Sequence, residues 1–365
     1  MTGVYERLIR PMLFEHDSEE IHDFTLNTLG RLSGNRLLLE ALEAFTGAEA
    51  LPIDCFGLRF PNPIGLAAGM DKRAAAVPVW EAMGFGFCEL GGVTWHEQPG
   101  NPKPRMFRAV KEEALVNRMG FNNPGAAMFA RKLAEWRVSD QWPKHPVGVN
   151  LGKSKITPLE MAAEDYANSF RAVKPYADFV VVNVSSPNTP NLRKLQDKDS
   201  LLEILNALHE VNRKGEPIPI LLKVAPDLTL EALDEILGVY DSRRVQGIVA
   251  ANTTIERAET GDRQSATTYA ETGGLSGRPL SQRSTDIIRH LYRQTGGKVP
   301  IVGVGGVFDA EDAWDKITAG ASLVQIYTGL VYRGPSVTRE IVRGLRERVC
   351  DAGLKQLSDA VGIAA

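Results

Sequence analysis

The sequence predicts an α/β protein in which eight parallel strands close into a (β/α)8 (TIM) barrel, preceded by a small N-terminal helical extension. Three observations favour this fold. Short apolar runs recur from about residue 60 onward, amphipathic segments separate them, and a polar stretch rich in Gly, Asn or Ser follows each run. Eight strand–helix units over about 280 residues are more typical of a closed barrel than of an open doubly wound sheet.

Each apolar run has the length and the bounding residues of a buried parallel strand. The runs lie at 63–67, 87–91, 147–151, 179–184, 218–224, 247–251, 299–304 and 322–326. Amphipathic segments such as 232–240 and 310–319 predict the intervening helices. In a barrel, the residues that follow the strands gather at one face, and we expect the active site there.

Two connections are too long to be simple crossovers between strands. Residues 94–146 contain the run NRMGFNNPG, and residues 254–298 contain the run TGGLSGRPL. Long insertions in compact domains are usually functional. We therefore expect both connections to cover the mouth of the barrel.

Residues 1–46 differ in character from the barrel. Two amphipathic helices are expected there, one over residues 5–14 and one that begins near Ser18. The pattern suits either a cap packed on the barrel or a hairpin in a membrane interface, because arginines flank the apolar cluster of the first helix. The predicted division of the chain is this segment at 1–46, the barrel at 47–350 and a C-terminal tail at 351–365.

Composition disfavours several functional classes. The chain carries 42 Lys and Arg against 45 Asp and Glu, a net charge of −3, so a nucleic-acid partner is not expected. The three cysteines form no C-x-x-C pair, which disfavours a disulfide scaffold or a metal site and fits a reducing cytoplasm. No stretch approaches the ~20 apolar residues of a membrane-spanning helix.

Glycine-rich segments follow the last two predicted strands. The first is Gly303 to Gly306, and the second is Tyr327-Thr328-Gly329. In barrels these two loops often form a phosphate site, because glycine lets backbone N–H groups approach the anion, although tight turns alone also use glycine. At this position we favour a phosphorylated ligand. No Rossmann or Walker motif occurs, so a dinucleotide or ATP is less expected.

Asparagine recurs at the predicted strand ends. Asn150, Asn183 and Asn252 end three strands, and Asn117 and Asn188 lie in loops on the same face. An amide offers both a donor and an acceptor, which suits a planar heterocycle with alternating carbonyl and N–H groups. This pattern predicts a site for a flavin, a pyrimidine, or both.

Two lysines and one serine are candidates for the charge and the proton chemistry of this site. Lys72 and Lys223 each follow or end a strand, where an ammonium balances a substrate carboxylate or the negative charge on a reduced flavin. No hydrolytic motif occurs, since HExxH and GxSxG are both absent. Ser186, within NVSSPN, is a candidate proton acceptor, although serine is a weaker general base than His or Cys.

Together, the motifs resemble those of the dihydroorotate dehydrogenases, and among them the class 2, quinone-dependent, membrane-associated branch of bacterial type. The likeness covers nearly the whole chain. The motifs that carry it, in the family's order, are AAGMDK, PGNPKPR, NRMGFNN, NVSSPNTPNLR, KVAPDL, ANTT, TGGLSGRPL, GVGGV and LVQIYTGL.

The resemblance implies oxidation of (S)-dihydroorotate to orotate in de novo pyrimidine (UMP) synthesis. A hydride passes from C6 to N5 of one FMN per chain while a base removes a proton from C5, and a membrane quinone then reoxidises the flavin. Serine is the base in class 2 and cysteine in class 1, and Ser186 occupies that position. The resemblance also implies a peripheral enzyme on the cytoplasmic face of the cell membrane, attached through its N-terminal helices.

The same resemblance implies three groups of site residues. The expected FMN contacts are Ala67, Ala68, Gly69, Met70, Asp71, Gly92, Asn150, Asn183, Lys223, Ala251, Gly277, Gly306, Tyr327 and Thr328. The expected substrate contacts are Lys72, Asn117, Arg118, Met119, Gly120, Phe121, Asn183, Asn188, Asn252 and Thr253. The expected quinone-tunnel residues are His22, Arg108 and Tyr327. Gly92 and Ala251 depart from the family pattern, so flavin contacts through backbone or apolar atoms are expected there.

A mobile loop over residues 185–196 is expected to carry Ser186. Two other functions are compatible with the barrel pattern. One is an FMN oxidoreductase that uses NAD(P)H, and the other is a catalytically silent barrel that binds a phosphorylated ligand. Dihydroorotate-dependent flavin bleaching that a quinone reverses, and NAD does not, separates these possibilities.

Overall fold

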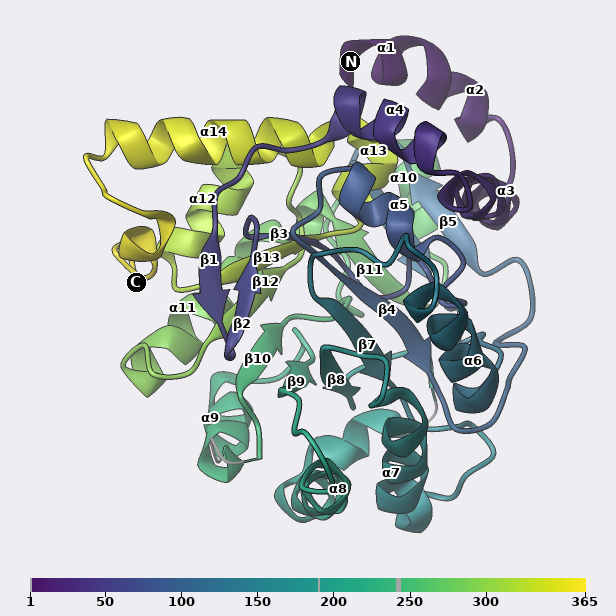
Figure 1. The fold of residues 1–365 in the computed structure, drawn as a ribbon, viewed down its shortest axis with the longest axis vertical. Coiled ribbons are helices and arrows are strands. Elements are labelled where there is room, and N and C mark those ends of the chain that lie inside the picture. Colours follow the sequence, from purple (N-terminus) through teal and green to yellow (C-terminus); the bar gives the residue numbers. More distant parts are fainter. Residues whose placement is uncertain (1, 190, 241–243) are drawn as a thin grey trace.

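The structure is a computed structural model that describes residues 2–189, 191–240 and 244–365. Its centre is a closed barrel of parallel strands in the order β10-β12-β13-β3-β4-β7-β8-β9 (Figure 1). The barrel strands are β3 (Ile64–Leu66), β4 (Phe87–Val93), β7 (Val147–Leu151), β8 (Phe179–Asn183), β9 (Ile220–Val224), β10 (Gly247–Ala250), β12 (Ile301–Val304) and β13 (Leu323–Ile326). Each strand overlaps one predicted apolar run, which confirms the (β/α)8 barrel.

Helices surround the barrel and bury their apolar faces against it. They are α5 (Val77–Ala82), α6 (Ala126–Arg137), α7 (Ala162–Val173), α8 (Lys198–Asn212), α9 (Leu230–Val239), α10 (Arg263–Tyr269), α11 (Ser281–Thr295), α12 (Ala310–Thr318), α13 (Thr328–Arg333) and α14 (Val337–Asp351). Short helical turns add η2 (Leu159–Met161), η3 (Leu192–Gln196), η4 (Arg278–Leu280) and η5 (Leu357–Ala360). Tyr166 on α7 is fully buried, and its hydroxyl donates to the carbonyl oxygen of Asn183 at 2.9 Å. Helix packing thereby fixes the end of β8.

A short antiparallel hairpin, β1 (Ile53–Cys55) and β2 (Leu58–Phe60), packs against the N-terminal ends of the barrel strands. Phe60 is fully buried, and its ring lies edge-on to Phe87 at a centroid distance of 5.3 Å. Phe87 in turn contacts Phe179 at the start of β8. This aromatic cluster closes the barrel at the end opposite the predicted site. The hairpin was not predicted, because Asp54 and Arg59 interrupt its two short strands, so neither is a continuous apolar run.

The two long connections meet in one antiparallel sheet over the other end of the barrel. Its strands are β5 (Met106–Ala109), β6 (Ala114–Asn117) and β11 (Gly274–Gly277), in the order β11-β6-β5. Register pairs Asn117 with Gly274. The expectation that both connections cover the barrel mouth is confirmed, although their pairing with each other was not predicted.

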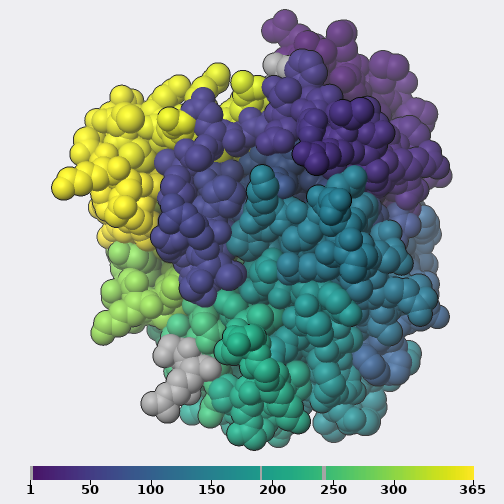
Figure 2. All heavy atoms as spheres, in the orientation of Figure 1, coloured from purple at the N-terminus to yellow at the C-terminus, as the bar shows by residue number. Residues whose placement is uncertain are grey.

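The N-terminal segment consists of α1 (Thr2–Val4), η1 (Tyr5–Ile9), α2 (Arg10–Phe14), α3 (Ser18–Ser33) and α4 (Arg36–Thr46). Figure 2 shows these residues, in purple, gathered at one corner of the molecule. The two expected helical stretches are present, and α4 is an additional helix. Asp17 caps α3, since its side chain accepts from the N–H groups of Glu19 and Glu20. The buried Glu19 carboxylate pairs with Arg105 at 2.7 Å, which ties α3 to the barrel insertion.

Candidate active site

A cavity of about 150 Å³ lies at the C-terminal ends of the barrel strands; we call it the mouth cavity. Residues from all parts of the predicted site line it. They are Ala67, Ala68, Gly69, Lys72, Gly92, Asn117, Met119, Gly120, Phe121, Asn150, Asn183, Ser186, Asn188, Lys223, Ala251, Asn252, Thr253, Gly277, Gly306, Tyr327 and Thr328. Parallel strands that end at one face bring these residues together, although they are far apart in the sequence.

Three of the predicted FMN and substrate contacts lie outside the mouth cavity. The carboxylate of Asp71 is buried and accepts from the N–H groups of Ala75 and Ala76, both at 2.9 Å, so it shapes its own loop. Met70 lines a second cavity, described below. The guanidinium of Arg118 pairs with Glu271 at 2.6 Å, and Arg118 is absent from the residues that line the mouth cavity.

Several residues of the mouth cavity were not predicted. They are Met106, Leu115, Ser276, Leu280, Val307, Gln325 and Ile326, whereas Val304, Gly305 and Gly329 belong to the two glycine-rich segments expected to bind phosphate. A usable signal existed for Gln325, and also for Glu89 beneath the cavity residues, because each is a polar residue inside an otherwise apolar strand. Apolar members such as Leu280 carry no comparable signal, because their side chains look like ordinary core.

Hydrogen-bonded side chains link the ends of β7, β8 and β10. The Nδ2 group of Asn183 donates to Oδ1 of Asn150 at 2.9 Å, and Nδ2 of Asn252 donates to Oδ1 of Asn183 at 3.3 Å. The hydroxyl of Ser185 donates to Oδ1 of Asn183 at 3.0 Å and accepts from Nδ2 of Asn252 at 2.9 Å. These four residues form one network, which we call the amide chain.

Glu89 on β4 anchors the amide chain. Its side chain is 0% exposed, Oε1 accepts from Nδ2 of Asn150, and Oε2 accepts from Nε2 of Gln325, both at 2.6 Å. Because both oxygens of Glu89 accept from amide N–H groups, the nitrogen of Asn150 faces Glu89 and its oxygen faces Asn183. Each later amide is then oriented by the one before it.

Glu89→Gln is expected to lower the free energy of unfolding by about 1–3 kcal/mol, because one buried N–H group would face another donor and lose its partner. Adding Asn150→Asp should restore most of this loss, since the new carboxylate accepts from both of its neighbours. Urea unfolding of the single and double variants measures both effects. A double variant no more stable than the single one would contradict the role given to Glu89.

Two lysines bring positive charge to the mouth cavity. Lys223 on β9 is buried and lies in register with Asn183 on β8. Burial, together with the nearby Arg105 guanidinium, lowers the pKa of Lys72 to about 8. Among the residues that the structure describes, neither ammonium forms an ion pair, and Glu19, whose charge acts on Lys72, pairs with Arg105 and Lys103 instead. Two ammoniums without an ion-pair partner favour an anionic ligand in this cavity.

Ser186 lies in the loop after β8. Its Oγ accepts from the backbone N–H of Asn188 at 3.3 Å, and the side chain of Asn188 donates to Oδ1 of Asn117 at 3.2 Å. Within the described ranges no carboxylate or imidazole bonds to this hydroxyl, and Ser186 lines the mouth cavity. Pro190, which belongs to the predicted mobile loop 185–196, lies outside the described residues.

Glycines line the part of the mouth cavity near β12 and β11. Gly306 has φ +70°, and a Cβ there would lie 2.5 Å from the side chain of Ser281. Gly277 has φ +102°, and a Cβ there would lie 2.2 Å from the carbonyl oxygen of Glu113. A ligand therefore meets backbone at both positions. At Gly92, too, a larger residue does not fit, because a Cβ there would lie 2.7 Å from the ring of Phe121.

A second cavity, of about 290 Å³, lies between the N-terminal helices and the barrel; we call it the helix cavity. Its lining is mostly apolar and includes the three predicted tunnel residues. The lining residues are Tyr5, Leu13, Phe14, Ser18, Ile21, His22, Thr25, Leu26, Leu29, Leu42, Met70, Trp80, Met83, Met106, Arg108, Leu115, Tyr327, Leu330, Val331, Gly334 and Pro335. Met106, Leu115 and Tyr327 line both cavities, so the two share a wall.

Two polar side chains of the helix cavity, His22 and Arg108, differ in charge. Burial, with Lys72 and Arg73 nearby, lowers the pKa of His22 to about 3, so its imidazole is neutral at neutral pH. The Nε group of Arg108 donates to Oγ of Ser18 at 2.8 Å, and its guanidinium lies 4.5 Å from the ring centroid of Phe14. Arg108 thus places one positive charge in a mostly apolar chamber, which suits a ligand with an apolar body and a polar head.

Comparison with known proteins gives consistent findings. The family model for dihydroorotate dehydrogenase matches residues 50–349. A dihydroorotate dehydrogenase (quinone) from Nostoc sp. is 46% identical over 375 residues, with 99% of this chain and 98% of the relative covered. The protein of that name from Gloeobacter violaceus is 48% identical over 362 residues, with 98% of each chain covered.

Solved structures agree with the sequence relatives. The Eimeria tenella DHODH in complex with ferulenol has a TM-score of 0.84 and 35% identity, covering 95% of this chain and 96% of that one. The ligand-free type from the same organism has a TM-score of 0.82 and 37% identity, covering 90% of this chain and 97% of that one. The similarity therefore includes the N-terminal segment as well as the barrel.

Proposed function

The chain belongs to the dihydroorotate dehydrogenase family, and from this membership we propose how its two cavities divide the reaction. The protein is an oxidoreductase of the quinone-dependent branch. It oxidises (S)-dihydroorotate to orotate in de novo pyrimidine synthesis, and a quinone is the final electron acceptor.

We propose that FMN binds in the mouth cavity, where three features fit it. Gly277 and Gly306 offer backbone to a phosphate, and Lys223 offers a cation. The buried Oε1 atom of Gln325 has no hydrogen-bond partner in the described part of the chain and offers an acceptor to a ring N–H group. When bound, FMN supplies the hydride acceptor and the electron carrier. The residues proposed to hold it are Ala67, Ala68, Gly69, Gly92, Asn150, Asn183, Lys223, Ala251, Gly277, Gly306, Tyr327 and Thr328.

We propose that the rest of the mouth cavity binds dihydroorotate. Lys72, which has no ion-pair partner in the described residues, holds the substrate carboxylate, and the amides of Asn117 and Asn252 orient the ring. The Oγ atom of Ser186 accepts the proton from C5. Because Glu89 orients the amide chain, the donor and acceptor pattern offered to the ring is set before substrate arrives.

The shared wall of the two cavities is the observation that carries this proposal. Tyr327, Met106 and Leu115 separate a cavity that two lysines and several asparagine amides line from one that is almost entirely apolar. A charged, water-soluble substrate and an apolar quinone need such different surroundings, and both must come within electron-transfer reach of one cofactor. We propose His22, Arg108 and Tyr327 as quinone contacts in the helix cavity.

A steady-state assay with dihydroorotate and several electron acceptors tests the proposal. The expected result is turnover with a quinone and none with NAD or NADP. Turnover with a nicotinamide would favour the other type of FMN barrel enzyme. A colourless protein that takes up no added FMN would favour a barrel that only binds a phosphorylated ligand.

We propose that residues 1–46 are a membrane- and quinone-access segment, followed by the FMN-binding barrel at 47–350 and a tail at 351–365. Within the described ranges, no helix is long and apolar enough to span a bilayer. Eight of the sixteen large apolar side chains found exposed in the described chain lie in this segment, with exposures of 46% to 75%. Such a concentration near the helix cavity supports peripheral attachment to a membrane, and we propose that this is the cytoplasmic face of the cell membrane.

Leu8→Ser combined with Met12→Ser is expected to lower binding to phospholipid vesicles at least about tenfold, because two side chains that would enter the interface become polar. Because these side chains are 64% and 69% exposed, the substitutions should leave the folding stability close to that of the wild type. Co-sedimentation with vesicles measures the effect. The matched control, Val138→Ser with Ile156→Ser, changes two exposed side chains of the barrel and should leave binding unchanged. Equal effects in both pairs would contradict the assignment.

A further inference from the structure

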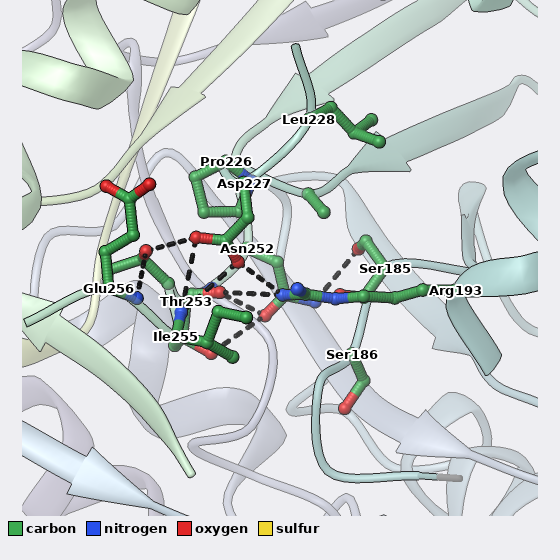
Figure 3. Close-up of polar contacts among 12 residues, drawn as sticks. Ser185, Ser186, Arg193, Pro226, Asp227, Leu228, Asn252, Thr253, Ile255 and Glu256 are labelled. Carbon is green, nitrogen blue, oxygen red and sulfur yellow. Dashed lines mark hydrogen bonds and ion pairs between the residues drawn. The ribbon is translucent and has the colours of Figure 1, made fainter. Parts of the chain in front are cut away.

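An arginine outside the reacting groups holds the loop that carries Ser186. The Nε group of Arg193, in η3, donates to the carbonyl oxygen of Ser185 at 3.1 Å, and its Nη2 group donates to that of Thr253 at 3.4 Å. The same Nη2 group forms an ion pair of 2.7 Å with Oδ2 of Asp227. Figure 3 shows the guanidinium reaching from η3 toward these groups.

Asp227, in the run KVAPDL after β9, joins this arginine to another loop. Its Oδ1 atom accepts from the hydroxyl of Thr254 and, at 3.3 Å, from the N–H group of Ile255. The backbone of Thr254 pairs with Leu275 on β11. Arg193 and Asp227 therefore connect the loops that follow β8, β9 and β10, and through Thr254 they reach the sheet over the barrel mouth.

We propose that Arg193 and Asp227 form a latch that holds the Ser186 loop closed over bound dihydroorotate, with Arg193 as a positioning residue. Arg193 fixes the peptide unit between Ser185 and Ser186, so it sets the backbone from which the proposed base extends. It also holds the backbone of Thr253, a proposed substrate contact. One guanidinium therefore sets the distance between the loop of the proposed base and the loop that contacts the substrate. The inference rests on the proposed function, because it takes Ser186 as the base.

The surroundings of the pair suit a latch that opens and closes. The side chains of Arg193 and Asp227 are 24% and 11% exposed, so water can replace their contacts when the loop opens. The turn that carries Arg193 is itself anchored, because Leu192 and Leu195 are buried. The side chain of Ser186 points away from the polar cluster in Figure 3, so closure leaves its hydroxyl available to substrate.

Rapid-mixing measurement of flavin reduction by dihydroorotate tests the latch in Arg193→Met and Asp227→Asn. Each substitution removes the ion pair at similar volume, and the asparagine keeps an oxygen for Thr254 and Ile255. We expect each variant to retain flavin and to reduce it about 10- to 100-fold more slowly, because the base is displaced from its substrate. The double variant should be no slower than Arg193→Met, since that substitution already removes the ion pair with Asp227.

Arg137→Met is the matched control. Arg137 pairs with Asp178 at 2.8 Å, with exposures of 34% and 28%, and also donates to the carbonyl oxygen of Tyr176. This pair repeats the chemistry of the latch at the start of β8, away from the mouth cavity. The control should reduce flavin at the wild-type rate.

A second readout does not depend on catalysis. In Asp227→Asn, which keeps Arg193 and Lys194, trypsin should cleave the 185–196 loop at least about tenfold faster than in the wild type, because the loop opens more often. Cleavage and flavin reduction both within twofold of the wild type would overturn the latch. If dihydroorotate does not reduce the flavin of the wild-type protein, the proposed function is overturned instead. The cleavage rates of the wild type and of Asp227→Asn would then still test the latch.

Discussion

Ser186→Ala is expected to slow the reduction of bound flavin by dihydroorotate by about 100- to 10,000-fold, because it removes the proposed acceptor of the C5 proton. In the described chain the Oγ atom of Ser186 bonds only to the N–H group of Asn188, so its removal leaves the amide chain intact. Flavin content and orotate binding should therefore stay close to those of the wild type. Anaerobic rapid mixing, which follows the visible flavin absorbance, measures the rate.

Ser186→Cys is the informative companion variant. A thiol has an ordinary pKa of about 8.5 and is a better base once it is ionised. This variant should recover part of the lost rate, and its rate should rise with pH until about 8.5, since the thiolate is the active form. Reduction of the alanine variant at the wild-type rate, or a cysteine variant as slow as alanine at every pH, would show that Ser186 is not the base.

Filling the helix cavity is expected to slow the reaction with quinone and to leave the reduction of the flavin by dihydroorotate unchanged. Ile21→Trp combined with Leu29→Trp places two indoles in a cavity of about 290 Å³, so a quinone ring loses its space. Turnover with quinone should fall at least about tenfold, a loss of about 1.4 kcal/mol of binding or activation free energy. Reduction of the flavin by dihydroorotate should continue at the wild-type rate, because neither residue lines the mouth cavity.

Two controls make this result specific. Ile156→Trp adds the same bulk at a barrel side chain that is 74% exposed, and it should change neither half-reaction. Thermal unfolding of the filled variant reports any strain from overpacking, which typically amounts to about 1–3 kcal/mol. Unchanged quinone turnover, or an equal loss of both half-reactions in a folded protein, would contradict the role of the helix cavity.

The barrel was predictable because its strands are buried on both faces. Such strands read as continuous apolar runs, and all eight runs found by this rule overlap barrel strands. The hairpin β1–β2 and the sheet of β5, β6 and β11 escaped prediction for another reason. They are not continuous apolar runs, since Arg59 interrupts β2 and Arg108 interrupts β5, and β11 lies far along the chain from its partners, so its pairing depends on the closed barrel.

The candidate site was predictable where chemistry and strand ends coincide. Asn150, Asn183 and Lys223 were found because polar residues at successive strand ends must face one mouth. Their hydrogen-bond order was not predictable, since it depends on Glu89, whose burial and partners follow from the closed barrel. The same holds for Arg193, which a sequence shows only as a charge in a loop.

Sequential rapid mixing tests the central claim, that the two cavities serve the two half-reactions of one flavin. Purified protein is mixed anaerobically with dihydroorotate and then with either a quinone or NAD. The expected result is bleaching in the first step and recovery of colour with the quinone alone. Failure of dihydroorotate to bleach the flavin, or recovery with NAD and not with the quinone, would contradict it.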